Sequence, residues 1–224
     1  MSLSSKEYEN YLAHDRAMVS RLARSLHEWF AEMSGKTVVD MGCGSGDTGA
    51  LLVKRFRVIG VDEQASALEN AHKLGLGTVR ASLEEKIPLA TSSADNVICK
   101  DVFEHLVHPH HLRGEIHRIL KKGGRLYAHV PNQFTLLDRV QMLFGLSMVV
   151  SRWFPGTTEW NFPHLRFFTR SGFRKFLEEG GFAIEREYED MFYYHLPFGL
   201  TTRFLSKISP ELFAPGFTVT SVKK

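Results

Sequence analysis

The sequence predicts an α/β fold, a mostly parallel sheet with helices on both faces, and two observations lead to it. First, short apolar runs alternate with stretches of helical spacing between residues 37 and 130, which is the pattern of strands joined by helices. Second, runs such as VIGV at 58–61 are apolar throughout and do not alternate with polar residues. Runs of this kind are typical of strands that are buried on both sides of a sheet.

The same pattern places each element along the chain. Strands are expected at 37–41, 57–62, 78–82, 95–100 and 125–130. Helices are expected at 47–56, 64–74, 110–120 and 169–179, after an amphipathic N-terminal helix over 5–33. Two closing strands, which we expect to be antiparallel, are placed at 182–189 and 217–222.

Length, charge and cysteine usage narrow the class of protein. The 224 residues are enough for one large domain over 1–224,. A net charge of +3 without a run of five like charges leaves no electrostatic footprint for nucleic acid,. Two cysteines, Cys43 and Cys99, cannot form a disulfide framework,, which favours a reducing cytoplasm. The first residues lack a signal-peptide pattern, and the longest uncharged stretches, of 12 residues, are too short for membrane insertion,.

A glycine-rich turn, VVDMGCGSGD at 38–47, joins the first strand to a helix. Glycines let a backbone approach a ligand closely, and a helix N-terminus offers it N–H groups. The spacing Gly44-x-Gly46-x-x-Gly49 also fits a dinucleotide loosely,. Asp40, which we expect to point toward the cleft, argues against a pyrophosphate because like charges would repel by roughly 1–4 kcal/mol. It favours the cationic amino-acid end of S-adenosylmethionine.

A second carboxylate, Asp62, follows the second strand and lies 20 residues after Gly42. An acidic residue at this position can accept hydrogen bonds from both hydroxyls of a ribose. The two acidic residues together therefore predict a nucleoside with a cationic tail.

Four segments carry a family resemblance, in this order: VVDMGCGSGD, VIGVDEQ, DNVICKDVFEHLVHP and LRGEIHRILKKGGRLYAHVPN. They resemble the class I S-adenosylmethionine-dependent methyltransferases over about 36–132, and most of all the type 11 group with the ubiquinone- and menaquinone-pathway enzymes. A weaker similarity to the methionine-biosynthesis methyltransferase-like branch continues through 164–182. The resemblance implies a Rossmann-like, seven-stranded sheet. The segment KDVF at 100–103 is unlike the Asn/Asp-Pro-Pro-aromatic sequence of enzymes that methylate nucleic-acid bases.

The resemblance also implies roles for individual residues. The loop that holds the methionine end of the cofactor matches Asp40, Gly42, Cys43, Gly44 and Gly46. The ribose-binding position matches Asp62, with Glu63 beside it. Ser82 and Leu83 match the adenine position. The family usually has an acidic residue where Ser82 stands, and Glu84, two residues later, could substitute for it. The wall around the methionine tail and the methyl group matches Lys100, Asp101 and His105.

The segment after the fourth strand allows three interpretations. His105 could remove a proton from an attacking hydroxyl or amine. Alternatively, Asp101, Glu104 and His105 could bind a divalent metal ion, or Glu104 and His105 could only fix the following loop. No metal ligand is assigned, and the nearby His108, His110 and His111 are read as solvated. The basic residues Lys121, Lys122 and Arg125 are likewise read as a solvated face.

Aromatic residues are concentrated late in the chain, where 19 of 26 lie between 134 and 217. Besides a core of 35–132 and an N-terminal segment of 1–34, we expect two cap segments, 133–168 and 191–214, over the carboxyl ends of the strands. Their candidate lining residues are Trp153, Phe154, Trp160, Phe162, His164, Arg166, Tyr193, Tyr194 and His195. An aromatic pocket suits a small, apolar acceptor, although a homodimer interface or a cap core would also explain it.

The sequence therefore predicts methyl transfer from S-adenosylmethionine to an oxygen or nitrogen nucleophile, with S-adenosylhomocysteine as the product. His105 and His164 are the expected catalytic proton acceptors. A non-catalytic cofactor-binding or partner-binding protein of the same fold is an alternative. An NAD-dependent dehydrogenase is disfavoured by Asp40.

Overall fold

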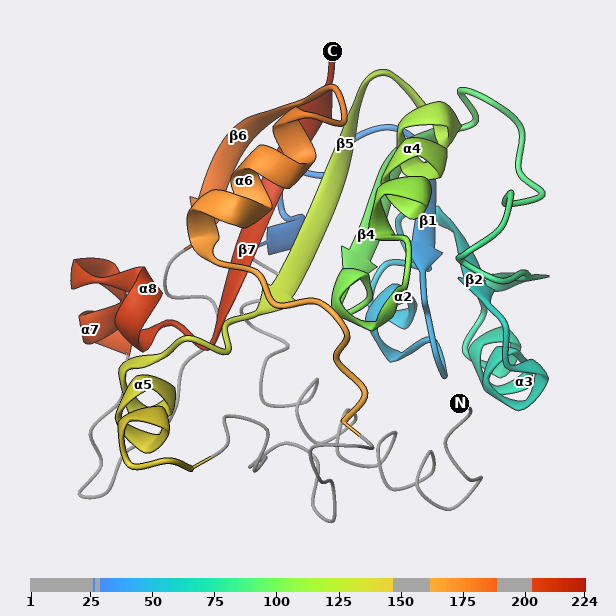
Figure 1. Ribbon diagram of the computed structural model, residues 1–224. Helices are drawn as coiled ribbons and strands as arrows, with labels where there is room; N and C mark the ends of the chain where they lie inside the picture. Colours follow the sequence, from blue (N-terminus) through green and yellow to red (C-terminus); the bar gives the residue numbers. More distant parts are fainter. Residues whose placement is uncertain (1–25, 27–28, 147–161, 189–202) are drawn as a thin grey trace.

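Seven strands form one sheet in the order β3-β2-β1-β4-β5-β7-β6 in the computed structural model, which describes residues 26, 29–146, 162–188 and 203–224 (Figure 1). The strands are β1 (Thr37–Met41), β2 (Arg57–Asp62), β3 (Gly77–Arg80), β4 (Ala94–Lys100), β5 (Leu120–Pro131), β6 (Phe182–Tyr188) and β7 (Gly216–Lys223). The helices are α2 (Asp47–Ala50), α3 (Ala65–Lys73), the 3₁₀ helix η1 (Phe103–His105), α4 (Pro109–Ile119), α5 (Leu136–Leu143), α6 (Arg170–Glu178), α7 (Arg203–Ile208) and α8 (Pro210–Phe213).

The strand directions confirm the mostly parallel sheet. Strands β1 to β5 pair in parallel, whereas β7 pairs antiparallel with both β5 and β6. Among the described strands β7 alone is therefore reversed, and the two closing strands are antiparallel to each other as expected. The order reverses between β1 and β4, so the carboxyl ends of these central strands flank the crevice where α/β sheets bind ligands.

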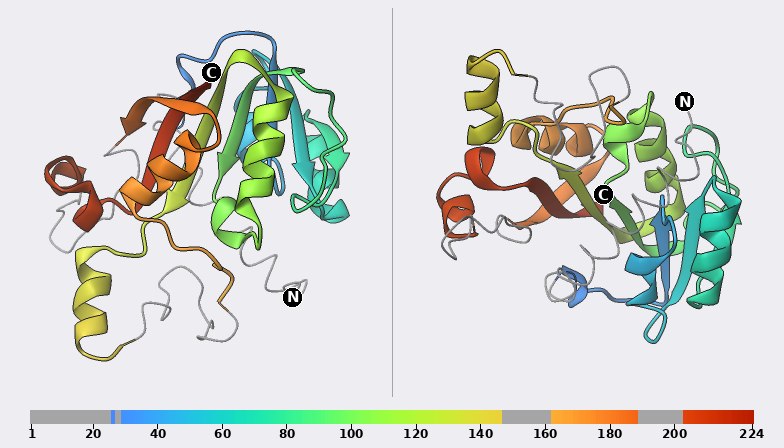
Figure 2. Two further views of the ribbon diagram at one scale, coloured as in Figure 1. Left: turned by 45° about the horizontal axis from the view of Figure 1, so that its top comes forward. Right: turned by 90° about the horizontal axis from the view of Figure 1, so that it is seen from below.

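Two apolar cores cover the two faces of the sheet. One core contains Leu112 and Ile116 of α4 with Phe173 of α6. The other contains Trp29, which precedes β1, and Leu68 of α3. Figure 2 shows α4 and α6 on one side of the sheet and α2 on the other. This is the doubly covered sheet that the continuous apolar runs predict.

Only the end of the predicted helix over 5–33 falls within the described residues. Residues 29 and 30 are helical, and Trp29 stacks on Phe30 with their ring centroids 5.2 Å apart. Both rings meet the edge of Tyr127 on β5 at 5.9 Å. These contacts fix the entry to β1 against the second core.

Two sequence-predicted elements differ in length from those of the structure. The helix expected over 47–56 is helical only to Ala50 and continues as turns to residue 55. The strand expected to begin at 125 is assigned from Leu120, with a register irregularity before Arg125 where Gly123 has a φ of +72°. Gly123 and Gly124 therefore lie where the pairing of β4 with β5 is interrupted.

The described parts of the two cap segments follow β5 or precede β7, at the carboxyl edge of the parallel strands (Figure 1). Helix α5 is amphipathic but exposes large apolar side chains, with Leu143 80% and Phe144 76% exposed. None of the described helices is long and apolar enough to cross a membrane. Trp153, Phe154, Trp160, Tyr193, Tyr194 and His195 lie outside the described residues.

Candidate active site

The loop after β1 depends on glycine at two positions. Gly42 and Gly46 have φ angles of +67° and +85°, a conformation that other residues adopt at a cost,. A Cβ on Gly42 would lie 2.6 Å from Cγ2 of Val102, and one on Gly46 would lie 2.8 Å from Cα of Ala71. The loop therefore packs closely against both the end of β4 and helix α3. Gly44, between them, also has a positive φ of +51°.

Asp62 joins the end of β2 to this loop. Its Oδ2 atom accepts a hydrogen bond of 2.9 Å from the backbone N–H of Gly44, and its Oδ1 atom accepts one of 3.0 Å from Gln64. A carboxylate oxygen can accept more than one hydrogen bond, so each oxygen keeps capacity for a ligand hydroxyl. The neighbouring Glu63 is exposed.

The orientation of Asp40 differs from the sequence prediction. Asp40 is 3% exposed, and its Oδ2 atom lies 3.1 Å from the position of a Cβ on Gly49 of α2. Because side chains alternate along a strand, Asp40 shares a face with Val38, which belongs to the second core. The carboxylate thus lies beneath the loop, toward α2, and does not line the cleft directly.

Cys43 also points away from the cleft. A Cβ on Gly60 of β2 would lie 2.7 Å from Sγ of Cys43, so the thiol packs against that glycine. Burial raises the pKa of the Cys43 thiol, and the charges of Asp40 and Asp62 add to the effect. The thiol is therefore neutral, and only the backbone of Cys43 can face a cofactor.

The two residues expected at the adenine position have different surroundings in the structure. Leu83 packs beside Gly42, with Cδ1 3.5 Å from the position of a Cβ there, and Ser82 accepts a hydrogen bond of 3.3 Å from the backbone of Glu84. The Glu84 carboxylate accepts hydrogen bonds from the backbone N–H groups of Val107 and His108, the latter at 3.1 Å. Glu84 therefore orders the loop before α4.

At the end of β4, Asp101 is held between Lys100 and His129. It forms an ion pair with Lys100, and its Oδ1 atom lies 2.5 Å from Nδ1 of His129 on β5. Burial would raise the pKa of Asp101, but Lys100 and His129 hold it well below its usual range. Asp101 also has a φ of +55°, unusual for a residue other than glycine,.

His129 was not predicted as part of this site. It pairs with Lys100 in the register of β4 and β5. The only sequence signal for His129 was its position in the apolar run of β5. The register that pairs it with Lys100 cannot be read from one segment alone,.

The segment 162–168 is bound to η1 by three hydrogen bonds. The carbonyl of Glu104 accepts from the backbone N–H groups of Leu165 and Arg166, at 2.7 and 3.0 Å. Nδ1 of His105 lies 3.1 Å from the carbonyl of Pro163 and donates to it. The rings of His105 and His164 consequently meet edge to face, with centroids 4.7 Å apart. The structure thus brings together the two histidines that the sequence singles out.

Glu104, His105 and His164 form an acidic–histidine cluster in which Glu104 is buried and the two histidines are half-buried. Burial raises the pKa of Glu104 well above its usual range, and the charge of Asp101 adds to this. Burial lowers the pKa of His105, and it lowers that of His164, next to His105, to about 3. Both imidazoles are therefore neutral at pH 7. Gln133, which follows β5, is hydrogen-bonded to Nδ1 of His164.

The remaining candidates lie apart from this cluster. His108 and His110 are exposed and contact each other, with ring centroids 5.7 Å apart. Of the basic residues, Lys121 pairs with Asp95 and Arg125 with Glu185, each at 2.6 Å.

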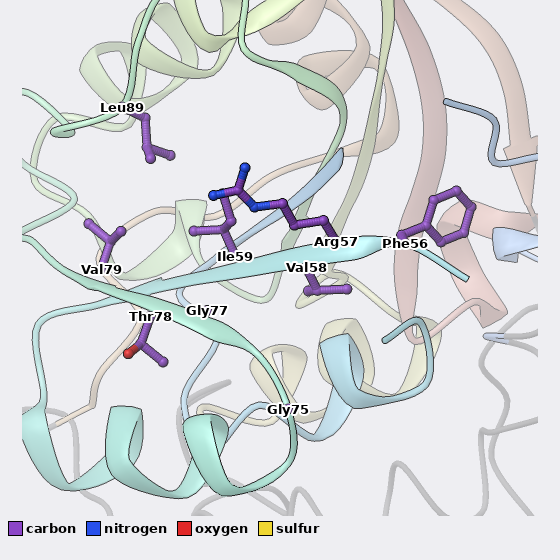
Figure 3. A pocket seen from close by; sticks show the side chains of 9 residues that line it. All are labelled: Phe56, Arg57, Val58, Ile59, Gly75, Gly77, Thr78, Val79 and Leu89. Atoms are coloured by element: carbon purple, nitrogen blue, oxygen red, sulfur yellow. The ribbon is translucent and has the colours of Figure 1, made fainter. Parts of the chain in front are cut away.

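A cavity of about 310 Å³ lies beside the starting residues of β2 and β3. Figure 3 shows Arg57, Ile59 and Val79 on the side of the two strands that Leu89 faces. The cavity is at the opposite end of these strands from Asp62, so we do not assign it to the site.

Comparisons with known proteins show which proteins this chain is similar to. A family model described as a methyltransferase domain matches residues 39–128. A ubiquinone biosynthesis O-methyltransferase from Pseudomonas paraeruginosa is 29% identical over 110 residues, 46% of this chain and 47% of the relative. A trans-aconitate 2-methyltransferase from Azoarcus sp. is 33% identical over 120 residues, 51% of this chain and 47% of the relative. The chain thus spans about half the length of the curated relatives it matches.

A solved structure extends the likeness to nearly the whole fold. It is a S-adenosylmethionine-dependent methyltransferase from Thermotoga maritima, described as a possible histamine N-methyltransferase. The TM-score is 0.66 at 19% identity, with 99% of this chain and 96% of the other covered. The predicted resemblance and fold class are confirmed, and S-adenosylmethionine is the cofactor that the domain match and the fold support.

Proposed function

We propose that this chain, whose residues 39–128 form a methyltransferase domain, transfers the methyl group of S-adenosylmethionine to an oxygen or nitrogen nucleophile of a small, mainly apolar acceptor. The observation that carries the proposal is the meeting of two groups of residues at one edge of the sheet. The glycine-rich loop and Asp62 follow β1 and β2, and the acidic–histidine cluster follows β4. Since β1 and β4 are neighbours, the two groups offer the cofactor half and the acceptor half of one site.

In the cofactor half, Asp62 would accept hydrogen bonds from the ribose hydroxyls while it holds the loop at Gly44. Leu83, beside Gly42, would contact the adenine ring. Asp40 would act through its charge from beneath the loop, since attraction to the ammonium and sulfonium groups does not require direct contact. Lys100 and Asp101, at the end of β4, would line the methionine tail.

The reaction would be a direct displacement. The bond between the methyl carbon and the sulfonium sulfur breaks as the bond to the acceptor atom forms, and S-adenosylhomocysteine leaves. The acceptor also loses a proton, and His105 and His164 are the catalytic residues that would assist this loss as neutral imidazoles,. Alignment of the two reactants supplies much of the rate.

The surroundings of the two histidines support an apolar acceptor. The ring of Phe162 meets that of His164 with centroids 4.9 Å apart. Elsewhere in the same cap segment, Leu143 at the end of α5 and Phe144 after it are exposed. The cytoplasmic location we propose agrees with the two cysteines, which are both free and buried. No observation favours a non-catalytic protein or an NAD-dependent dehydrogenase, and a homodimer stays a prediction.

The proposal is tested by the transfer of a labelled methyl group from S-adenosylmethionine to a panel of small phenols, amines and carboxylic acids. We expect turnover of at least one apolar acceptor, and at least a tenfold loss of turnover in His164→Ala, with S-adenosylhomocysteine affinity within about 0.5 kcal/mol of wild type. Equal turnover of His164→Ala and wild type would contradict the role of His164. His110→Ala, on the exposed start of α4, serves as the control.

A further inference from the structure

One carboxylate and two imidazoles converge where segment 162–168 meets η1. Each of Glu104, His105 and His164 offers one ligand atom, and the three atoms lie within 4.8 Å of one another. Nε2 of His105 lies 3.9 Å from Oε1 of Glu104, too far for a hydrogen bond,. The space between these atoms therefore has polar groups on three sides that do not satisfy one another.

Glu104 is the least satisfied member of the cluster. It is 1% exposed, and neither of its carboxylate oxygens has a hydrogen-bond partner among the residues that the structure describes. A buried carboxyl group that has neither a hydrogen-bond partner nor a cation is costly to the fold. Oε1 of Glu104 lies 3.9 Å from Nε2 of His105, and a cation between these two side chains and His164 would satisfy the carboxyl group.

From this geometry we propose that Glu104, His105 and His164 bind one divalent transition-metal ion of the Zn²⁺ type. The role of the ion rests on the proposed function, because the ion would contact the nucleophilic atom of the methyl acceptor. With the ion bound, the two imidazoles would act as ligands and not as bases. The metal would lower the pKa of the acceptor oxygen that it binds, so that the acceptor releases its proton to solvent.

The type of ligand selects the type of metal. Two imidazoles and one carboxylate are the ligands of catalytic zinc sites and of open iron sites, whereas Mg²⁺ prefers oxygen ligands alone. Ligand atoms about 2.1 Å from a tetrahedral ion are roughly 3.4 Å apart. Because the three ligand atoms lie within 4.8 Å of one another, small side-chain movements would bring them to that distance. Three protein ligands leave a fourth position for the acceptor.

The surroundings hold the imidazoles in place. Nδ1 of His105 is bound to the carbonyl of Pro163, and Nδ1 of His164 is bound to Gln133. Metal-bound histidines commonly donate their second ring N–H to a carbonyl or carboxylate, as His105 does to Pro163,. The backbone hydrogen bonds from Leu165 and Arg166 to Glu104 keep the two ligand-bearing segments together.

Asp101 does not belong to this ligand set. The sequence suggested Asp101, Glu104 and His105 as possible ligands, but the Asp101 carboxylate is bound by Lys100 and His129. The third ligand comes instead from His164, 59 residues beyond His105, which strand order alone does not place there.

Titration of the metal-free full chain with Co²⁺, which reports four-coordination through its visible absorption, tests the proposal. We expect one ion per chain in the wild type and displacement of Co²⁺ by Zn²⁺. Glu104→Gln and His164→Ala should each weaken binding by at least about tenfold, the smallest loss seen when outer partners of a metal ligand are removed. His72→Ala, an exposed histidine on α3, should bind as the wild type does.

Affinity for S-adenosylhomocysteine, measured on the same samples, shows that each variant is folded. The metal proposal is overturned if the wild type has no saturable Co²⁺ site, or if Glu104→Gln binds Co²⁺ as tightly as the wild type. Methyl transfer by a protein that binds no metal would overturn this inference and leave the proposed function intact. Metal binding without any methyl transfer would support this inference and contradict the proposed function.

Discussion

At the scale of single residues, Gly46 illustrates how backbone conformation serves the cofactor loop. An alanine there would need a φ of +85°, and its Cβ would lie 2.8 Å from Cα of Ala71. We expect Gly46→Ala to lower the free energy of unfolding by about 1–2 kcal/mol or more, because the strain and the clash add, and to weaken S-adenosylhomocysteine binding. Chemical denaturation and calorimetry would measure the two effects.

Gly114 is the matched control, since nothing lies within 4 Å of a Cβ added at this position inside α4. Gly114→Ala should raise the free energy of unfolding by about 0.4–1 kcal/mol, because alanine favours a helix more than glycine does. If Gly46→Ala were as stable as the wild type and bound the ligand equally well, the assigned role of the loop would be wrong.

The sequence could predict which residues stand at the strand ends, but not where each side chain points. Asp62 and the glycines follow from local spacing, since a strand must end where the turn begins. The burial of Asp40 beneath the loop depends on which face of β1 meets α2. The hydrogen bonds of Glu84 to Val107 and His108 depend on a contact between distant loops, which local pattern does not encode.

At the scale of elements, Glu115 and Arg118 attach α4 to the segment before β4. Glu115 accepts a hydrogen bond of 2.8 Å from the backbone of Ile87, and Arg118 donates to the carbonyls of Ile87 and Leu89. The two side chains also form an ion pair of 2.7 Å. The hydrogen bond from Arg118 is the main reason that the pKa of Glu115 is lowered.

A lowered pKa means that the folded state favours the charged carboxylate, so its contribution to stability is present above the ordinary glutamate pKa and is lost as the pH falls. We expect Glu115→Gln to reduce the free energy of unfolding at pH 7 by about 1–3 kcal/mol. The difference from wild type should shrink below about pH 4.3. Urea denaturation from pH 3 to 7 measures it, with exposed Glu85→Gln as the control. A difference that did not change with pH would contradict the ion pair.

The elements themselves were largely predictable because apolar periodicity is local. Strands β1, β2, β4, β6 and β7 begin and end within a residue or two of their predicted positions. Helix α2 is shorter than predicted. Beyond its end, backbone hydrogen bonds of turns hold the buried residues Leu52 and Phe56. The contact between η1 and segment 162–168 was not predictable, because it joins residues about 60 positions apart.

At the scale of the whole molecule, the strand order places the proposed cofactor and acceptor groups at one edge of the sheet. A ligand that binds only the folded state there must stabilise the entire domain. At 100 times its dissociation constant, S-adenosylhomocysteine should add about 2.7 kcal/mol, which for a chain of this size raises Tm by roughly 5–10 °C. Thermal unfolding measures the shift. A rise in Tm with NAD but not with S-adenosylhomocysteine would support the dinucleotide alternative.

The most direct test of the account is calorimetric titration of S-adenosylhomocysteine into the wild type and Asp62→Ala, with Glu69→Ala, an exposed residue of α3, as the control. We predict micromolar affinity for the wild type and the control, about 7–9 kcal/mol. Asp62→Ala should bind more weakly by about 1.5–3 kcal/mol, because it loses the charged acceptor for the ribose hydroxyls and the anchor of Gly44,. Absence of binding to the wild type, or an unchanged affinity in Asp62→Ala, would contradict the account.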